Sequence, residues 1–239
     1  MNFKRFLGKC RRGADVVTLN AYATYSQVGE DRIISYLFHS LNIPLPSYLD
    51  IGTNEPIISN NTFLLYDKGC KGVCIEPDPK MVKVIKRKRP KDIVLNVGIG
   101  ITETSDAAFY LFPGKLNGWS TFSELEAGIR EAESGLKAKI ISIPLKNIND
   151  IIATYFNPYP NFISLDVEGL DLDILKSLDF DRFQPEVICV ETISFSITNT
   201  EEKLDDIMDF MHSKGYFTYA DTHVNTIFCK KSLFNKSEK

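Results

Sequence analysis

The sequence has almost no excess charge and no long apolar run, and each shortage excludes a class of protein. Lysine and arginine number 28 against 31 aspartate and glutamate, for a formal net charge of −3. This balance argues against a general binder of nucleic acid. No apolar run approaches the roughly 18 residues of a membrane-spanning helix, and the N-terminus lacks the apolar part of a signal peptide. We therefore expect no stable membrane insertion and no export.

Cysteine is scarce, and its five positions suit neither a disulfide framework nor a zinc centre. Cys70 and Cys74 are spaced C-x3-C, with no second pair of Cys or His nearby. Most of the cysteines lie in apolar runs, which favours buried free thiols and a reducing compartment, so we predict a cytoplasmic protein. Basic residues among the first twelve positions are interpreted as a solvated terminus, with contact to anionic lipid as the alternative.

What the sequence does contain is typical of one α/β domain. Its 239 residues are 44% hydrophobic and 25% charged. Short apolar runs alternate with helical patterns from about Tyr48 to Lys231, which predicts βαβ units. The short link Asp221–Asn225 allows only an antiparallel hairpin between the last two strands. We predict a Rossmann-like α/β fold, a mostly parallel seven-stranded sheet with an antiparallel last strand and helices on both faces.

The same patterning suggests how the chain is divided. An amphipathic helix over Gln27–Asn42 precedes the sheet, so residues 1–46 are predicted to be a basic segment and helical cover, and residues 47–239 the main domain. The polar excursion 113–138 has a length typical of a lid or acceptor loop. A basic run is interpreted as a solvated helix face rather than a site for an anionic ligand. It comprises Lys80, Lys83, Lys86, Arg87, Lys88, Arg89 and Lys91.

The segment Tyr48–Asn54 is an apolar strand that leads into a turn with one glycine, Gly52. A ligand can approach the backbone closely there, at the carboxyl end of a strand. A dinucleotide fingerprint would have three glycines, so a pyrophosphate ligand such as NAD is disfavoured. Asp50 suits a cationic or amine-bearing ligand. Glu76 ends the next strand, about 24 residues after Gly52, where an acid can accept hydrogen bonds from the two ribose hydroxyls. S-adenosylmethionine meets both requirements.

An acidic cluster follows another buried strand. Asp166, Glu168, Asp171 and Asp173 lie close in sequence, and like charges raise one another's pKa. Asp166 or Glu168 is the candidate general base, with His223 in the last hairpin link as a second candidate. Mg²⁺ at the acids is an open alternative, since hard cations take carboxylate oxygens, although the spacing does not match an EF-hand and we expect no metal site.

Four further residues are candidates for holding an acceptor. Trp119 offers an aromatic face to sugar C–H groups, and the hydroxyls of Ser120 and Thr121 can pair with sugar hydroxyls. Glu191 ends another predicted parallel strand at the same edge of the sheet. We therefore predict that Trp119, Ser120 and Thr121 form an acceptor platform, and that Glu191 either holds the acceptor or has a structural role.

Together these segments resemble the FkbM-type family of S-adenosylmethionine-dependent methyltransferases, whose members methylate hydroxyls of sugars and polyketides. The resemblance covers most of the chain and is specific only as a set. One departure is Thr53, where the family usually has alanine. The matching segments are Tyr25–Asp31, Asp50–Asn54, Ser59–Thr62, Gly72–Pro77, Leu95–Ile99, Ser120–Thr121 and Ser164–Gly169.

The resemblance implies where the cofactor S-adenosylmethionine is bound. It places Glu76 at the ribose and Asn96–Ile99 near the adenine, with Asn96 and Val97 as the contacts. The other implied cofactor contacts are Gln27, Glu30, Asp50, Gly52, Asn54 and Asp166, with Asp50, Gly52 and Asn54 at the methionine end.

The expected function is therefore an O-methyltransferase that acts on a hydroxyl of a sugar or glycoconjugate precursor in glycan or polysaccharide biosynthesis. One alternative is methylation of a polyketide or other small secondary metabolite. Another is a nucleotide-binding or scaffold module without turnover. A homo-oligomer is left open.

Overall fold

The structure is a computed structural model that describes residues 24–101, 105–167, 169–193 and 203–234. The basic N-terminal residues, Cys10 and the candidate base Glu168 lie outside these ranges. The division of the chain at residues 46 and 47 stays a prediction.

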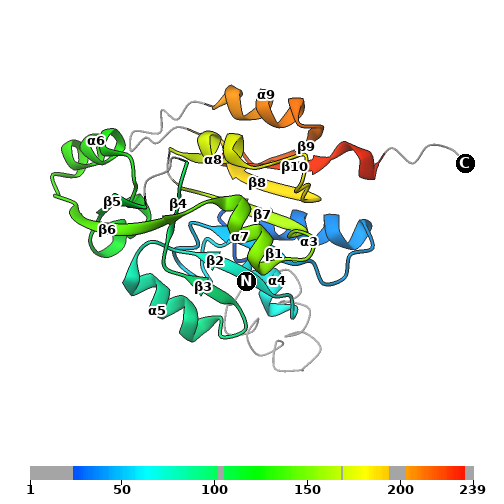
Figure 1. The fold of residues 1–239 in the computed structure, drawn as a ribbon, viewed down its shortest axis with the longest axis horizontal. Coiled ribbons are helices and arrows are strands. Elements are labelled where there is room, and N and C mark those ends of the chain that lie inside the picture. Colours follow the sequence, from blue (N-terminus) through cyan, green and yellow to red (C-terminus); the bar gives the residue numbers. More distant parts are fainter. Residues whose placement is uncertain (1–23, 102–104, 168, 194–202, 235–239) are drawn as a thin grey trace, which may run out of the picture.

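A seven-stranded sheet forms the centre of the fold, in the order β3-β2-β1-β7-β8-β10-β9 (Figure 1). All its strands run parallel except β10, which pairs antiparallel with both β8 and β9. The predicted α/β class and the antiparallel last strand are confirmed. The strands are β1 (Tyr48–Ile51), β2 (Gly72–Ile75), β3 (Ile93–Leu95), β7 (Phe162–Leu165), β8 (Val187–Glu191), β9 (Tyr216–Asp221) and β10 (Asn225–Lys230).

Strand alternation divides the side chains between two covered faces of the sheet. In β1, Leu49 and Ile51 belong to a core cluster packed by helices α7 (Ile148–Tyr155), α8 (Asp171–Ser177) and α9 (Asp205–Ser213). Tyr48 points to the opposite face, which packs against α3 (Glu30–Ser40) and α4 (Phe63–Asp67). On that second face α5 (Pro79–Lys88) packs Val82 and Ile85 against Cys74 and Val94. Helices therefore cover both faces, as predicted.

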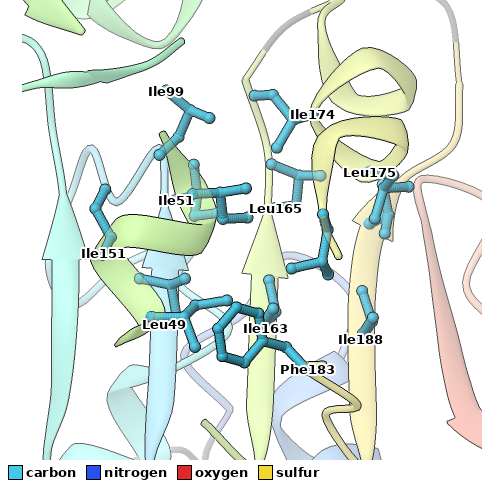
Figure 2. Close-up of a cluster of buried hydrophobic side chains, with 14 of the residues drawn as sticks. Leu49, Ile51, Ile99, Ile151, Ile163, Leu165, Ile174, Leu175, Phe183 and Ile188 are labelled. Atoms are coloured by element: carbon cyan, nitrogen blue, oxygen red, sulfur yellow. The ribbon is translucent and has the colours of Figure 1, made fainter. Parts of the chain in front are cut away.

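The larger core cluster extends to the carboxyl ends of the strands. Figure 2 shows Leu49 and Ile163 at one level and Ile51 and Leu165 at the next, with Ile99 and Ile174 beyond them. The side chains of this upper part of the cluster are buried; Ile51 is 1% exposed and Ile174 is 2% exposed. A rigid apolar floor thus lies beneath the edge where ligands bind in folds of this kind.

A second, three-stranded sheet is inserted after β3, in the order β4-β6-β5 (Figure 1). Its strands are β4 (Gly98–Ile99), β5 (Asp106–Leu111) and β6 (Lys139–Lys146). Between β5 and β6 the chain forms the 3₁₀ helix η1 (Gly114–Trp119) and helix α6 (Glu124–Ser134). The predicted excursion 113–138 is therefore an ordered pair of helices, and its role as a lid stays a prediction.

The helices begin where side chains satisfy their free amides. Asp78 accepts from the Lys80 amide ahead of Pro79 and starts α5, and Ser123 does the same for α6 through Glu126. Asn60 accepts from the Thr62 and Phe63 amides, so α4 begins later than the predicted Asn60. The 3₁₀ helix η2 (Lys231–Leu233) follows the last strand.

Four cysteines, Cys70, Cys74, Cys189 and Cys229, are buried free thiols, as predicted. Within the described ranges, no helix combines the length and the hydropathy needed to cross a membrane.

Candidate active site

A cavity of about 430 Å³ opens at the carboxyl ends of β1, β2 and β7. Its walls are the turns after these strands, β4 and the end of η1. The strand order of the sheet reverses between β1 and β7, and ligands of open α/β sheets bind at such a point. The volume lies in the range of small-molecule sites, which is roughly 300–1,000 Å³.

Gly52 allows two of these turns to touch. Its φ is +81°, and a Cβ atom at this position would lie 1.9 Å from the carbonyl oxygen of Asp166. Its amide donates to the carbonyl of Ile75 at 3.0 Å. Only glycine fits this backbone without displacing the turn after β7, so Gly52 sets the shape of the cavity.

Glu76 is a buried carboxylate in the cavity wall. One of its oxygens accepts from the amide of Asn54 at 2.8 Å, and the other accepts from the amide of Asp78 at 2.7 Å. Burial raises the pKa of Glu76 to about 7, against the effect of these two amides. Each carboxylate oxygen has a further lone pair, so Glu76 can still accept from ligand hydroxyls.

Asn96 supports Glu76 from behind. Its side-chain amide donates to the carbonyls of Glu76 and Pro77 at 2.9 and 2.8 Å. The cavity wall is formed instead by its neighbours, Val97 and the glycine and isoleucine of β4. Asn96 therefore fixes the turn after β2, and Val97 is the residue of this pair that faces the cavity.

Asp50 differs from the expectation, because its side chain lies on the other face of the sheet. It forms an ion pair with Arg89, whose Nη1 is 3.3 Å from Oδ2, and accepts from the hydroxyl of Thr62 at 2.6 Å. Strand alternation is the cause, since Leu49 and Ile51 occupy the opposite face. Arg89 also departs from the predicted solvated helix face, because it is 0% exposed.

The two predicted contacts before α3 separate in the same way. Gln27 lines the cavity. Glu30 is buried and accepts from the amide of Val28 at 2.9 Å, the hydroxyl of Thr222 at 2.7 Å and the side chain of Asn225 at 3.0 Å. Burial acts to raise its pKa, but these hydrogen bonds outweigh it and lower the pKa of Glu30. Glu30 thus fastens α3 to the last hairpin rather than reaching the cavity.

Asp166 brings a carboxylate to the cavity. It is half-buried and shares a hydrogen bond with Glu191, which does not line the cavity. Burial and the charge of Asp50 raise the pKa of Asp166 to about 6. A carboxyl group with this raised pKa is able to accept a proton at a pH just below neutral.

The other acids of the cluster have structural positions. Asp171 is buried and accepts from the amides of Val167 and Gly169 at 3.2 and 3.3 Å, which orders the turn that holds Asp166. Burial, with Asp166 second, raises the pKa of Asp171 to about 7. Asp173 is exposed. Among the residues that the structure describes, no three His, Cys, Asp or Glu side chains gather closely enough to hold a metal ion.

His223 lies in the hairpin link, as predicted, but does not reach the cavity wall. It is exposed at a φ of +75°, its amide donates to Asp221, and its carbonyl accepts from Lys203. The link is anchored on Lys203, which directs His223 to solvent. The structure therefore separates His223 from the site.

On the acceptor side, Trp119 and Ser120 line the cavity, while Thr121 is buried behind them and pairs with the backbone of Tyr110. Sequence analysis missed two residues that hold this wall. Asn117 donates to the side chain of Asn54 at 2.8 Å, and the buried Arg130 donates to the carbonyl of Trp119 at 2.6 Å. The position of Arg130, three residues after the buried Ala127 on α6, was the available signal.

The family model of the methyltransferase FkbM domain matches residues 50–218. No curated protein matches the chain in sequence. Similar solved structures have low identities and TM-scores, so they add no argument to the family match.

One of them is a 1,6-didemethyltoxoflavin-N1-methyltransferase from Burkholderia thailandensis, with bound 1,6-didemethyltoxoflavin and S-adenosylhomocysteine; it is 7% identical, with 95% of this chain and 86% of that one covered and a TM-score of 0.43. A putative caffeoyl-CoA O-methyltransferase from Staphylococcus aureus is 12% identical. The match covers 91% of this chain and 90% of that one, with a TM-score of 0.46. An O-methyltransferase from Bacillus cereus, in complex with S-adenosylhomocysteine, is 12% identical. The match covers 90% of this chain and 86% of that one, with a TM-score of 0.42.

Proposed function

The chain belongs to the FkbM family of S-adenosylmethionine-dependent methyltransferases, and we propose that it methylates a hydroxyl group of a sugar or glycoconjugate precursor. The observation that carries this proposal is one cavity in which Gly52, Glu76 and Asp166 meet at the reversal of strand order. A buried acceptor of ribose hydroxyls and a carboxylate with a pKa near neutral are the two groups that this transfer needs.

The cofactor half of the proposal assigns roles to residues of the wall. Glu76 accepts hydrogen bonds from the ribose hydroxyls, Val97 with Ile99 covers the adenine, and the backbone at Gly52 and Asn54 receives the methionine end. S-adenosylmethionine supplies a methyl group on a positively charged sulfur. Support comes from the fit, because these residues line a single cavity and Glu76 keeps free lone pairs.

Asp166 is the proposed general base. As the acceptor oxygen bonds to the methyl carbon, the carbon–sulfur bond breaks and its electron pair stays on sulfur, while the hydroxyl proton passes to the Asp166 carboxylate. Glu191 is the positioning residue that holds this carboxylate through their shared hydrogen bond. A positioned base of this kind contributes roughly 10² to 10⁴ in rate.

The acceptor is proposed to lie against η1. Trp119 offers its ring to sugar C–H groups, and Asn117 is the polar neighbour in the same wall. A polyketide or other small secondary metabolite is the second candidate acceptor, since an aromatic wall also suits a hydrophobic hydroxylated ligand. We further propose a cytoplasmic role in glycan biosynthesis, supported by the four buried free thiols.

Calorimetric titration with S-adenosylmethionine, S-adenosylhomocysteine and NAD, each with and without Mg²⁺, tests the cofactor half. We expect micromolar binding of both adenosyl ligands, no binding of NAD and no change with Mg²⁺. Glu76→Ala should weaken binding by about 1–3 kcal/mol, since charged hydrogen bonds are lost. Asp173→Asn, at an exposed acid outside the cavity, is the matched control and should bind normally.

Methyl transfer from labelled cofactor to a panel of sugars, nucleotide sugars and small phenols then tests the acceptor half. Transfer to sugars in preference to phenols supports the proposal. Tight binding of the cofactor without transfer to any acceptor would favour a scaffold without turnover. Absence of adenosyl-ligand binding would contradict the cofactor half itself.

A further inference from the structure

A second cavity, of about 370 Å³, lies beside the first. It is enclosed by the start of α5, the end of β5 with the start of η1, and the chain entering β6. Asp78, Met81 and Asn117 line both cavities. The two spaces therefore share a wall, and a ligand that extends past Asn117 from one would enter the other.

The charge of this second cavity is opposite in sign to the charge of the chain. Among the described residues, its lining includes Lys80, Lys137 and Lys139 and one acid, Asp78. The chain as a whole carries a net charge of −3. Three lysines from two distant segments border one hollow, which creates a local attraction for anions. We name this space the lysine cavity.

The opposing acids are already engaged. One oxygen of Asp78 accepts from the backbone amide of Lys80 at 2.8 Å, as the cap of α5. Lys137 pairs with Glu131, whose other oxygen accepts from the amide of Ala138 at 2.9 Å. Lys137 is largely exposed, so that pair is weak and yields readily to an anion of higher charge. Lys80 and Lys139 are exposed at the rim.

The remainder of the lysine cavity is apolar. Leu111, Phe112 and Pro113 form its floor, and Phe112 is only 1% exposed. A small inorganic anion or the phosphate backbone of a nucleic acid would gain no binding energy from such an apolar floor. A ligand that joins a charged group to a carbon ring would use both the lysines and the apolar surface.

From this geometry we propose that the lysine cavity binds the phosphate or diphosphate of a phosphorylated sugar acceptor, whose sugar ring lies over the apolar floor and extends past Asn117 toward the main cavity. This inference rests on the proposed function and deepens it, because it names the chemical class of the acceptor. It also changes the interpretation of Lys80, which belonged to the predicted solvated helix face. The neighbouring Lys83 and Lys86 on α5 remain exposed and outside the lysine cavity.

The test uses the full chain saturated with S-adenosylhomocysteine, whose binding is measured first. Glucose 1-phosphate, UDP-glucose, inorganic phosphate and the neutral methyl glucoside are then titrated by calorimetry at low and moderate salt. We expect both sugar phosphates to bind at least tenfold more tightly than methyl glucoside, with affinity that falls as salt rises. Comparison of glucose 1-phosphate with UDP-glucose distinguishes a monophosphate from a diphosphate as the preferred group.

The double variant Lys80→Gln/Lys139→Gln should weaken sugar phosphate binding at least tenfold and leave S-adenosylhomocysteine binding unchanged. Lys83→Gln/Lys86→Gln removes the same charge from the same side of the fold and should leave both unchanged. Equal losses in the two double variants would overturn the proposal, as would sugar phosphates that bind no better than methyl glucoside. If the parent protein does not bind S-adenosylhomocysteine, the proposed function itself is contradicted. The two failures are therefore distinguishable.

Discussion

The guanidinium of Arg89 lies 3.3 Å from the carboxylate of Asp50 in a region where both side chains are buried, at 0% and 5% exposure. Arg89 also donates to Asp92 at 2.8 Å and lies over the rings of Tyr48 and Tyr66 at 5.4 and 5.5 Å. One cation thus balances two carboxylates between aromatic faces. Removal of one partner from such a group leaves buried charge without compensation.

Arg89→Met should therefore lower the free energy of unfolding by about 3–5 kcal/mol, because Asp50 and Asp92 lose their cation. Urea unfolding followed by circular dichroism measures this loss. Arg87→Met is the matched control, since Arg87 is exposed on the same helix and its replacement should change stability by less than about 0.5 kcal/mol. Equal stability of the two variants would show that the buried group contributes nothing.

Gly52→Ala should destabilise the protein by more than about 4 kcal/mol and abolish binding of S-adenosylhomocysteine, because the new Cβ atom meets the carbonyl of Asp166. Gly135→Ala separates backbone strain from this clash. Gly135 also has a positive φ, of +69°, but nothing lies within 4 Å of its added Cβ, so we expect a cost of about 1–2 kcal/mol and normal binding. Similar costs at both sites would refute the close approach of the two turns.

Glu76 should make the folded state less stable as pH rises. Its pKa is about 7 when folded against 4.5 when free, so between these values the folded state binds more protons than the unfolded state and the free energy of unfolding falls with rising pH. The total effect is on the order of 3 kcal/mol.

Unfolding of the parent and of Glu76→Gln at pH 4.5 to 8 measures this contribution. The stability difference between the two proteins isolates Glu76, because Asp166 and Asp171 also have raised pKa values and are present in both. We expect the variant to show the shallower decline with pH. Parallel curves would mean that the pKa of Glu76 is the same in the folded and unfolded states.

Asp166→Asn should reduce turnover roughly 10² to 10⁴-fold while cofactor binding is retained. In the parent, kcat/KM should rise with pH through about 6, as Asp166 loses its proton, and the variant should lack this limb. Methyl transfer to the acceptor identified by the panel, followed from pH 5 to 8, measures both. Asp173→Asn is the control and should keep the rise of kcat/KM with pH. Loss of that rise in Asp173→Asn would contradict the assignment of Asp166 as the base.

Features with local causes were predictable from sequence. The strand ending at Ile51 and the turn at Gly52 follow from an apolar run and one glycine, and Glu76 follows from the next strand end. Asn54 and Val97 line the cavity because they follow the ends of β1 and β3. The predicted contacts of these residues with a cofactor stay predictions.

Features that depend on distant partners were not predictable. Asp50 points toward Arg89, 39 positions later, and nothing within the motif shows which face of the strand an acid occupies. A signal for Arg89 did exist, since it follows Val82 and Ile85 at helical spacing, although the helix ends at Lys88 and Arg89 is its C-cap. His223 was placed correctly in a hairpin link, but its direction depends on Lys203, which anchors that link.

The three hydrogen bonds that Glu30 accepts have a consequence for the order in which the protein folds during its synthesis. Two of them come from Thr222 and Asn225, 192 and 195 positions further along the chain. Before the last hairpin is made, this acid has only the amide of Val28 to replace water, and its burial is unfavourable. We therefore expect α3 to complete its docking only after the final hairpin has formed.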